Sequence, residues 1–101
     1  MRLTYPTALV LQALLDGHQH GFDIMAATGL PSGTVYPILR RLDGDGVVRS
    51  RWEREGAARR EQRPPRREYE LTSGGALLAR ESVARLAGMK PARLVPRKVE
   101  A

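Results

Sequence analysis

The sequence predicts an α+β fold that is mostly helical, and three observations lead to this class. Two short helical patterns are joined by a turn that contains glycine, and the second has a polar outer face. An arginine-rich segment with a period of two residues follows and indicates a β-hairpin. Apolar residues then recur at helical spacing, which indicates a last helix. Together these features predict a winged helix-turn-helix with a two-stranded β-wing and a C-terminal dimerisation helix.

The composition favours one small, basic domain. The 101 residues have a net charge of +6, and fifteen of the seventeen basic residues are arginine. Because guanidinium binds phosphate in a bidentate fork, this excess favours nucleic acid as a partner, although a GC-rich genome would also raise the arginine content. The absence of cysteine excludes disulfides and thiolate metal sites. No apolar run approaches the ~18 residues of a membrane span, and no leader pattern precedes the first helix, so we expect a cytoplasmic protein without membrane contact.

The first helix is predicted over residues 4–16. Pro6 suits its first turn, where the missing N–H costs no hydrogen bond. Gly17 is expected to end it, because glycine tolerates the reversed backbone of a following turn. Its inward face is expected at Leu9, Val10, Ala13 and Leu14, widened by Leu11 and Leu15.

The second helix is predicted over residues 22–28, after a loop with two histidines. Phe22, Ile24 and Ala27 are expected to face inward. The two histidines raise the alternative of a metal site, but no acidic residue or cysteine lies at a helpful spacing nearby. We therefore expect no metal, with His20 capping or packing over the second helix.

Residues 31–46 are predicted to contain the recognition helix, the one that enters the major groove of DNA. Ser32 offers a capping oxygen to the first turn, and Gly44 and Gly46 can end the helix. The opposite face from the buried stripe carries hydroxyls and guanidiniums, which suit phosphates and base edges. The buried stripe is expected at Val35, Ile38, Leu39 and Leu42. The DNA-binding candidates on this helix are Ser32, Thr34, Tyr36, Arg40 and Arg41.

Residues 46–55 and 66–71 alternate in polarity and predict the two strands of the wing. The residues between them are too polar to be buried, so we expect a long mobile tip. Residues 49–68 contain eight arginines and four glutamates, a local balance of +4. This charge favours contacts with the DNA backbone or minor groove over a hairpin that only keeps the protein soluble. The wing candidates for DNA binding are Arg51, Arg54, Arg59, Arg60, Arg63, Arg66 and Arg67.

Trp52 is expected to contact Tyr69 across the two strands at the foot of the wing. The alternative is that a planar ligand stacks on Trp52. A single tryptophan without a companion aromatic nearby in the sequence favours the packing role.

The last helix is predicted over residues 72–87, with Thr72 as its cap. Its apolar stripe has no later element to pack on, so we expect it to lie on the first helix and to meet a second copy of the chain. The dimerisation candidates are Leu9, Ala76, Ala79, Val83 and Leu86. Residues 1–87 would then form the domain. Residues 88–101 are basic and twice interrupted by proline, so we expect a disordered tail or an extra nonspecific DNA contact.

In their order along the chain, these segments resemble the PadR-like winged helix-turn-helix transcriptional regulators. The resemblance rests on residues 20–24, on residues 32–42, on residues 46–48 with Trp52, and on residues 69–72 with Gly75. The most specific part is the run Gly-Thr-Val-Tyr-Pro-Ile-Leu-Arg-Arg-Leu within the second of these segments.

The resemblance implies a homodimeric repressor that binds an inverted-repeat operator and that a small effector releases in some members. By position, Thr34, Tyr36 and Arg40 would meet the major groove, with Ser32 at the start of the helix. Two features depart from the usual pattern. The segment between His20 and Ser32 is about one helical turn shorter, and the short last helix is similar to that of the small members.

Two other classes of function compete with DNA binding. A winged helix can also serve as a protein-interaction adaptor, which would tolerate charge reversal at Arg40 and Arg41 without loss of partner binding. An enzyme is disfavoured, because the sequence has no nucleophile and base at a plausible spacing and no glycine-rich phosphate loop after a strand. We expect no cofactor.

Overall fold

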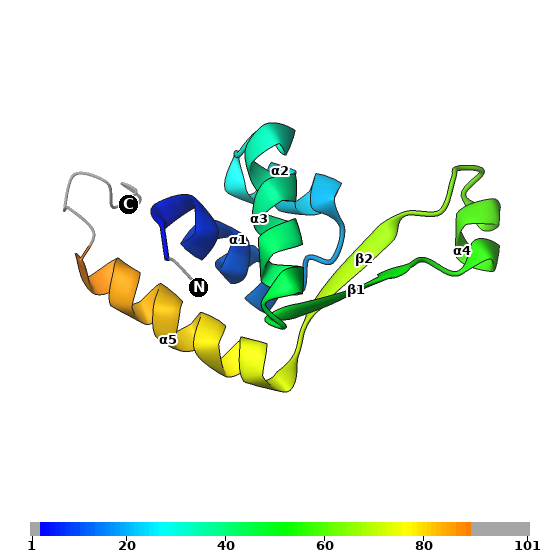
Figure 1. Ribbon diagram of the computed structural model, residues 1–101. Helices are drawn as coiled ribbons and strands as arrows, with labels where there is room; N and C mark the ends of the chain where they lie inside the picture. The colour runs from blue at the N-terminus through cyan, green and yellow to red at the C-terminus, as the bar shows by residue number, and fades with distance from the viewer. Residues whose placement is uncertain (1–2, 90–101) are drawn as a thin grey trace.

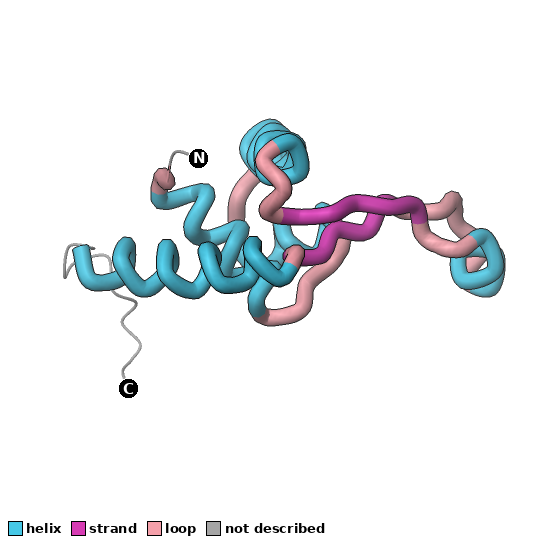
Figure 2. Tube along the Cα trace, turned by 60° about the horizontal axis from the view of Figure 1, so that its bottom comes forward, coloured by secondary structure: helices cyan, strands magenta, loops and turns pink. Residues whose placement is uncertain are grey.

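A computed structural model describes residues 3–89, apart from the side chains of residues 55, 57 and 86–89. Helices α1, α2, α3 and α5 form one body, from which the two strands extend and carry α4 at their far end (Figures 1 and 2). Among the described residues no helix has the length and hydropathy that a bilayer span requires. The mostly helical α+β class is confirmed. In chain order the elements are α1 (Tyr5–Leu15), α2 (Gly21–Thr28), α3 (Ser32–Gly44), β1 (Val48–Trp52), α4 (Glu55–Arg60), β2 (Arg67–Leu71) and α5 (Ser73–Met89).

Helix α1 is the central element of the body. Thr4 precedes it, and the Thr4 hydroxyl accepts from the Thr7 N–H at 3.3 Å, which satisfies one free amide of the first turn. Gly17 follows it with φ +99°, the left-handed backbone that the sequence predicts there. Helices α5, α2 and α3 all pack on α1, and Val10 and Leu11 are fully buried.

The core lies where α1, α2 and α3 meet the foot of the strands. The predicted stripe of α3 is confirmed, because Val35, Ile38, Leu39 and Leu42 are all buried. Ile24 from α2 and Val48 from β1 are buried against it. A Leu39→Ala change would cost about 2–5 kcal/mol, because Leu39 is fully buried and its neighbours cannot collapse completely into the space.

The expected inward face of α2 is wrong at two of three positions. Ile24 is buried, but Phe22 is 73% exposed and Ala27 is exposed. The covered positions are Gly21, Ile24, Met25 and Thr28, which follow the spacing of one helical stripe. Phe22 lies outside that stripe, so its ring is left at the surface.

The wing, defined here as residues 48–71, is a two-stranded antiparallel hairpin with a helix at its tip. The strands pair from Val48 opposite Leu71 to Trp52 opposite Arg67. The sequence predicts a tip too polar to be buried, but α4 forms there, and Ala58 is only 1% exposed. The sequence pattern missed this helix because six residues are too few to show a helical period.

Thr72 connects the wing to α5 and caps that helix as predicted. Its Oγ1 accepts from the Gly75 N–H at 2.9 Å and donates to the Gly46 carbonyl at 2.9 Å. A Cβ at Gly75 would lie 1.9 Å from the Val47 carbonyl oxygen, so only glycine permits this approach of α5 to the strand.

Helix α5 continues to Met89, two residues beyond the predicted end at 87. The residues of the predicted basic tail from 90 to 101 lie outside the described residues.

Candidate nucleic-acid interface

The N-terminus of α3 is not capped by Ser32 as the sequence predicts. Ser32 is the first residue of the helix, and Pro31 before it has the extended backbone of the cap position and no capping side chain. The Pro31 carbonyl accepts from the N–H groups of Thr34 and Val35, both at 3.0 Å. The Ser32 cap is therefore wrong, and the Ser32 side chain is exposed at the N-terminal end of α3.

Tyr36 joins α3 to α2. Its ring lies so close to Gly21 that a Cβ there would come within 2.4 Å of the ring and of the hydroxyl. Tyr36 as a whole is 38% exposed, so it also remains accessible to solvent. This close approach to Gly21 is part of the packing of α3 against α2.

Two edges of α3 are exposed, and they face different surroundings. Tyr36, Arg40 and Asp43 line a shallow cleft of about 250 Å³ together with Arg67 and Tyr69 of the wing. Arg41, the next candidate along α3, is exposed and lies outside the lining of this cleft. Among the described residues neither Arg40 nor Arg41 forms an ion pair, so both guanidiniums are available to a ligand.

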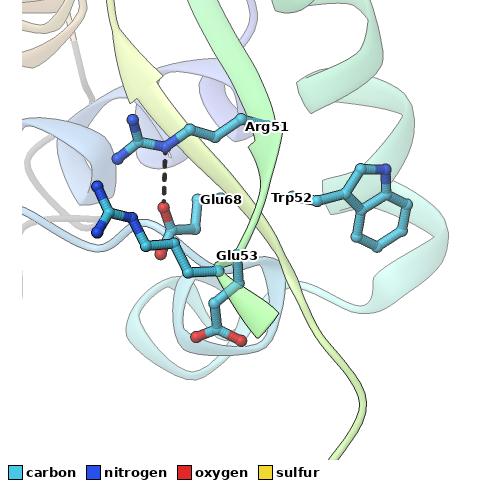
Figure 3. Close-up of a pocket in the computed structure, with 5 residues that line it drawn as sticks. Arg51, Trp52, Glu53 and Glu68 are labelled. Atoms are coloured by element: carbon cyan, nitrogen blue, oxygen red, sulfur yellow. Dashed lines mark hydrogen bonds and ion pairs between the residues drawn. The ribbon is translucent and has the colours of Figure 1, made fainter. Parts of the chain in front are cut away.

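Glu53 and Glu68 form ion pairs with the wing candidates Arg51, Arg63 and Arg66. Arg63 binds both carboxylate oxygens of Glu53, with its Nη2 at 2.9 Å from Oε2, and Arg66 Nη2 lies 3.6 Å from Oε2 of the same carboxylate. Arg51 Nε donates to Glu68 Oε1 at 3.1 Å (Figure 3). These arginines hold the hairpin together.

Glu53 is the centre of this arrangement. Its side chain is 7% exposed, and its Oε1 also accepts from the Arg66 N–H at 3.2 Å. The hydrogen bonds from Arg63 hold the pKa of Glu53 down at about 2, against an ordinary value of 4.5, although burial acts in the opposite direction. The same pairing raises the pKa of Arg63 above its usual range.

Exposure does not follow this pairing, because the Arg51 side chain is 66% exposed and the other four wing candidates are exposed as well. Arg54, Arg59 and Arg60 lie at or near α4. Arg67 lies closer to the body, where its Nη2 donates to the Ser50 hydroxyl at 3.0 Å. That hydroxyl donates to Asp43 Oδ2 at 3.1 Å, so a chain of hydrogen bonds connects the wing to α3.

Trp52 does not have the expected partner. Arg67 lies directly opposite Trp52, with its guanidinium carbon 5.3 Å from the ring centroid, whereas Tyr69 lies opposite Ser50. The register of the hairpin therefore places Trp52 and Tyr69 on diagonal positions two residues apart, and not directly opposite each other. Trp52 is 64% exposed and projects to the opposite side of the strand from Arg51 and Glu68 (Figure 3).

A cleft of about 320 Å³ lies between α2, α3 and the wing, and it collects most of the aromatic side chains of this surface. Phe22 and Trp52 are its most exposed rings, and burial raises the pKa of Tyr69. The sequence separates these rings widely, so no local pattern predicts the cleft. Its lining residues are His20, Gly21, Phe22, Tyr36, Trp52, Pro65, Arg66, Arg67 and Tyr69.

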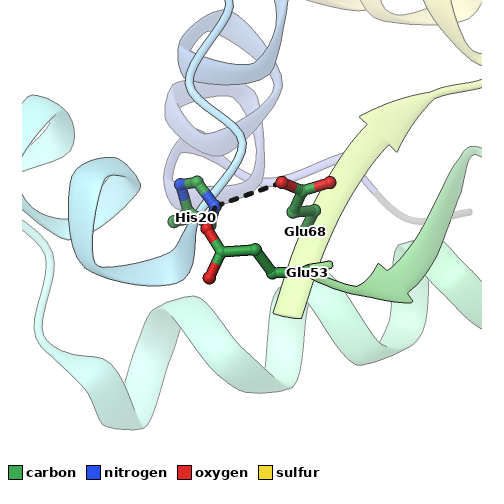
Figure 4. A group of neighbouring side chains, drawn as sticks. All are labelled: His20, Glu53 and Glu68. Atoms are coloured by element: carbon green, nitrogen blue, oxygen red, sulfur yellow. Dashed lines mark ion pairs between the residues drawn. The ribbon is translucent and has the colours of Figure 1, made fainter. Parts of the chain in front are cut away.

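His20 forms a second grouping that the sequence did not predict. Glu53 and Glu68 lie beside its imidazole, with the three ligand-type atoms within 4.8 Å of one another (Figure 4). The sequence places no such acidic residue at a helpful spacing from His20, but folding brings Glu53 and Glu68 from the two strand ends to it. His20 does precede α2 as expected, but its side chain makes no capping hydrogen bond.

The dimerisation candidates differ in their exposure. Ala79 is fully buried within this chain, so it packs α5 on α1 and cannot also contact a second copy. Leu9, Ala76 and Val83 are half-buried, and the side chain of Leu86 lies outside the described residues. Leu77 on α5, which is not among the candidates, is 57% exposed.

Comparison with known proteins identifies one family. Residues 10–81 match the sequence profile of the "Transcriptional regulator PadR-like family". No curated protein sequence matches significantly.

The chain is similar to several solved regulators. A PadR-like transcription factor from Bacteroides fragilis is 25% identical, with a TM-score of 0.66 over 82% of this chain and 81% of that one. A PadR family regulator from Clostridium difficile R20291 is 20% identical, with a TM-score of 0.71 over 85% and 91%. BpsR of Bordetella bronchiseptica, whose DNA binding is regulated by 6-hydroxynicotinic acid, is 26% identical, with a TM-score of 0.68 over 87% of this chain. The chain spans only 59% of BpsR and 56% of Lactococcus lactis ZitR.

Proposed function

The chain belongs to the PadR-like family of transcriptional regulators, and we propose that it is a homodimeric repressor that binds an inverted-repeat operator in double-stranded DNA. The observation that carries the proposal is the exposed edge of α3, where Arg40 and Arg41 have no ion-pair partner among the described residues. In this role the protein acts in the cytoplasm and catalyses no reaction.

Sequence would be read by α3 in the major groove. Arg40 and Arg41 can each donate two hydrogen bonds to a guanine edge, which is the commonest specific contact in this groove. Ser32 and Thr34 lie near the helix N-terminus, where hydroxyl and backbone N–H groups suit a phosphate. Tyr36 contributes by holding α3 against Gly21 and by presenting its exposed side to the duplex.

The wing would supply contacts that do not depend on sequence. Arg54, Arg59 and Arg60 are exposed at its tip, which suits the DNA backbone or the minor groove. Arg51, Arg63 and Arg66 are bound to Glu53 and Glu68, so their proposed role is to keep the wing in shape.

Dimerisation would use α1 and α5. Among the described side chains of α5, Leu77 is the most exposed large apolar one, and the half-buried Ala76 and Val83 lie on the same helix. A two-fold axis at this helix pair would present two copies of α3, with half-site centres about one turn of DNA, ~34 Å, apart.

Selection of bound sequences from a random duplex pool tests this function. The proposal predicts a palindromic consensus, and it predicts a mass of two chains per duplex in native mass spectrometry. Arg40→Ala should lose the consensus while keeping the fold, which circular dichroism monitors. A protein that enriches no sequence and remains monomeric at micromolar concentration would instead favour the alternative role as a protein-interaction adaptor.

We also propose that a small effector binds in the aromatic cleft of about 320 Å³ between α2, α3 and the wing. The exposed faces of Phe22 and Trp52 suit a planar ring, and Arg66 and Arg67 favour an anionic one. Trp52 is the only tryptophan, so its fluorescence reports binding directly. 6-hydroxynicotinic acid, which regulates BpsR, is a suitable first probe. A saturable change that Phe22→Ala removes would support the site, and an unchanged signal with a panel of aromatic acids would refute it.

A further inference from the structure

His20 lies where three segments of the chain meet, beside Glu53 and Glu68 (Figure 4). His20 immediately precedes α2, Glu53 follows β1, and Glu68 lies within β2. Backbone contacts hold this junction, because His20 pairs with Glu68 as an isolated bridge and the Tyr69 N–H donates to the Gln19 carbonyl at 2.7 Å. These backbone contacts therefore hold the three residues close to one another, whatever conformation their side chains adopt.

The imidazole of His20 is oriented like that of a metal ligand. Asp23 Oδ2 lies 3.4 Å from Nδ1, and a carboxylate in that place favours the tautomer with hydrogen on Nδ1. The lone pair of Nε2 then faces Oε2 of Glu68 at 3.7 Å and Oε2 of Glu53 at 3.9 Å. Nε2 is buried and has no hydrogen-bond partner among the described residues. The cluster therefore brings three possible ligand atoms together around a buried nitrogen that no hydrogen bond uses.

We propose that His20, Glu53 and Glu68 bind a divalent transition metal ion, with Zn²⁺ as the best fit. Bonds of about 2.1 Å in a tetrahedral site place ligand atoms about 3.4 Å apart. The two separations that involve His20 exceed this by only a few tenths of an ångström. One imidazole and two carboxylates suit Zn²⁺, whereas Mg²⁺ and Ca²⁺ prefer oxygen ligands alone.

Three guanidiniums compete for the same carboxylates. Arg51 uses Oε1 of Glu68 and leaves Oε2 facing His20. Glu53 is more fully engaged, because Arg63 contacts both of its oxygens. An ion bound at Oε2 of Glu53 must displace one guanidinium contact, so we expect weaker binding than in a closed structural zinc site.

This competition gives the metal site a consequence for DNA binding. A guanidinium released from Glu53 becomes free to contact phosphate, while the ion itself ties the wing to the segment before α2. Metal binding would then increase the salt dependence of DNA binding. This coupling rests on the proposed function, but occupation of the site by metal does not.

Titration of the chelator-treated, untagged full-length protein with Zn²⁺ alone tests the site without DNA. Isothermal titration calorimetry should show one ion per chain, and Co²⁺ should give a visible absorption band from a nitrogen and oxygen site. His20→Gln and Glu68→Gln should each weaken binding at least about tenfold, and Asp23→Asn by about tenfold. His18→Gln is the matched control, because His18 is outside the cluster, and it should bind like the parent protein.

Absence of saturable Zn²⁺ binding would overturn the proposal, as would equal losses in the His18 and His20 variants or equally tight Mg²⁺. Thermal unfolding of each variant without metal keeps the result interpretable, because loss of binding in a variant that melts like the parent identifies a lost ligand. A protein that binds Zn²⁺ at His20 but ignores every duplex would retain the metal site and reject the regulator function.

Discussion

The exposed edge of α3 and the foot of the wing are both rich in arginine, yet they use it differently. On α3, Arg40 and Arg41 have no ion-pair partner among the described residues. At the foot of the wing, Arg51, Arg63 and Arg66 are held by two glutamates. The difference shows that arginine content alone overstates a phosphate-binding surface, because a carboxylate that pairs with a guanidinium already balances its charge.

The largest expected effect comes from α3. Arg40→Ala should reduce the preference for the operator over a scrambled duplex by about 10- to 100-fold, because one good bidentate contact contributes about 1–3 kcal/mol of discrimination. Competition gel shifts with both duplexes measure it. An unchanged preference would remove Arg40 from the reading surface.

Gly21→Ala should also weaken operator binding, although Gly21 lies in α2 and not on the exposed edge of α3. The new methyl group would lie within 2.4 Å of the Tyr36 ring, so the ring or α3 must shift. We expect a several-fold weaker operator affinity in the same gel shifts. Gly44→Ala is the control, because nothing lies within 4 Å of a Cβ there, and it should bind like the parent. Equal affinity for both variants would mean that the Tyr36 contact does not matter for operator binding.

Glu53→Gln tests the foot of the wing. The neutral amide holds Arg63 and Arg66 less firmly, so we expect a lower melting temperature together with stronger nonspecific DNA binding at low salt. Calorimetry and fluorescence anisotropy with a random duplex measure the two effects. Glu61→Gln is the control, since Glu61 also pairs with Arg63 but is 65% exposed. Matching behaviour of the two variants would show that Glu53 has no special role.

The pH dependence of the wing should follow Glu53. Its pKa of about 2 lies below the ordinary 4.5, so the ionised carboxylate stabilises the fold above pH 4.5, and this contribution is lost as the pH falls toward 2. Trp52 fluorescence should therefore change over that interval. The change should be smaller in Glu53→Gln, and an equal change in both proteins would assign it to other acids.

The sequence predicted the parts of the fold that local patterns determine. The stripe from Val35 to Leu42 has one helical period, and Thr72 has the side chain that a helix cap needs. Gly17 occupies the turn that requires a positive φ. Each of these depends on neighbours within a few residues, so the sequence contains the whole signal.

The sequence could not predict what distant residues do together. Glu53 meets Arg63 across the tip of the wing, and His20 meets Glu68 only after the strands pair with the segment before α2. The inward orientation predicted for Phe22 is wrong, because a helix this short does not show in its sequence which residues face the core. The sequence alone therefore predicts candidate residues on α3. Which of the wing arginines pair with glutamates can be seen only in the structure.

The most direct test of this division compares Arg51→Ala with Arg60→Ala in the salt dependence of DNA binding. Affinity for one duplex, measured from low to moderate salt, gives the slope of log K against log salt. The account predicts that the slope for Arg60→Ala falls by about 1, whereas the slope for Arg51→Ala stays at the parent value, because Glu68 already holds Arg51. Equal falls for the two variants would contradict it and would show that all wing arginines contact DNA alike.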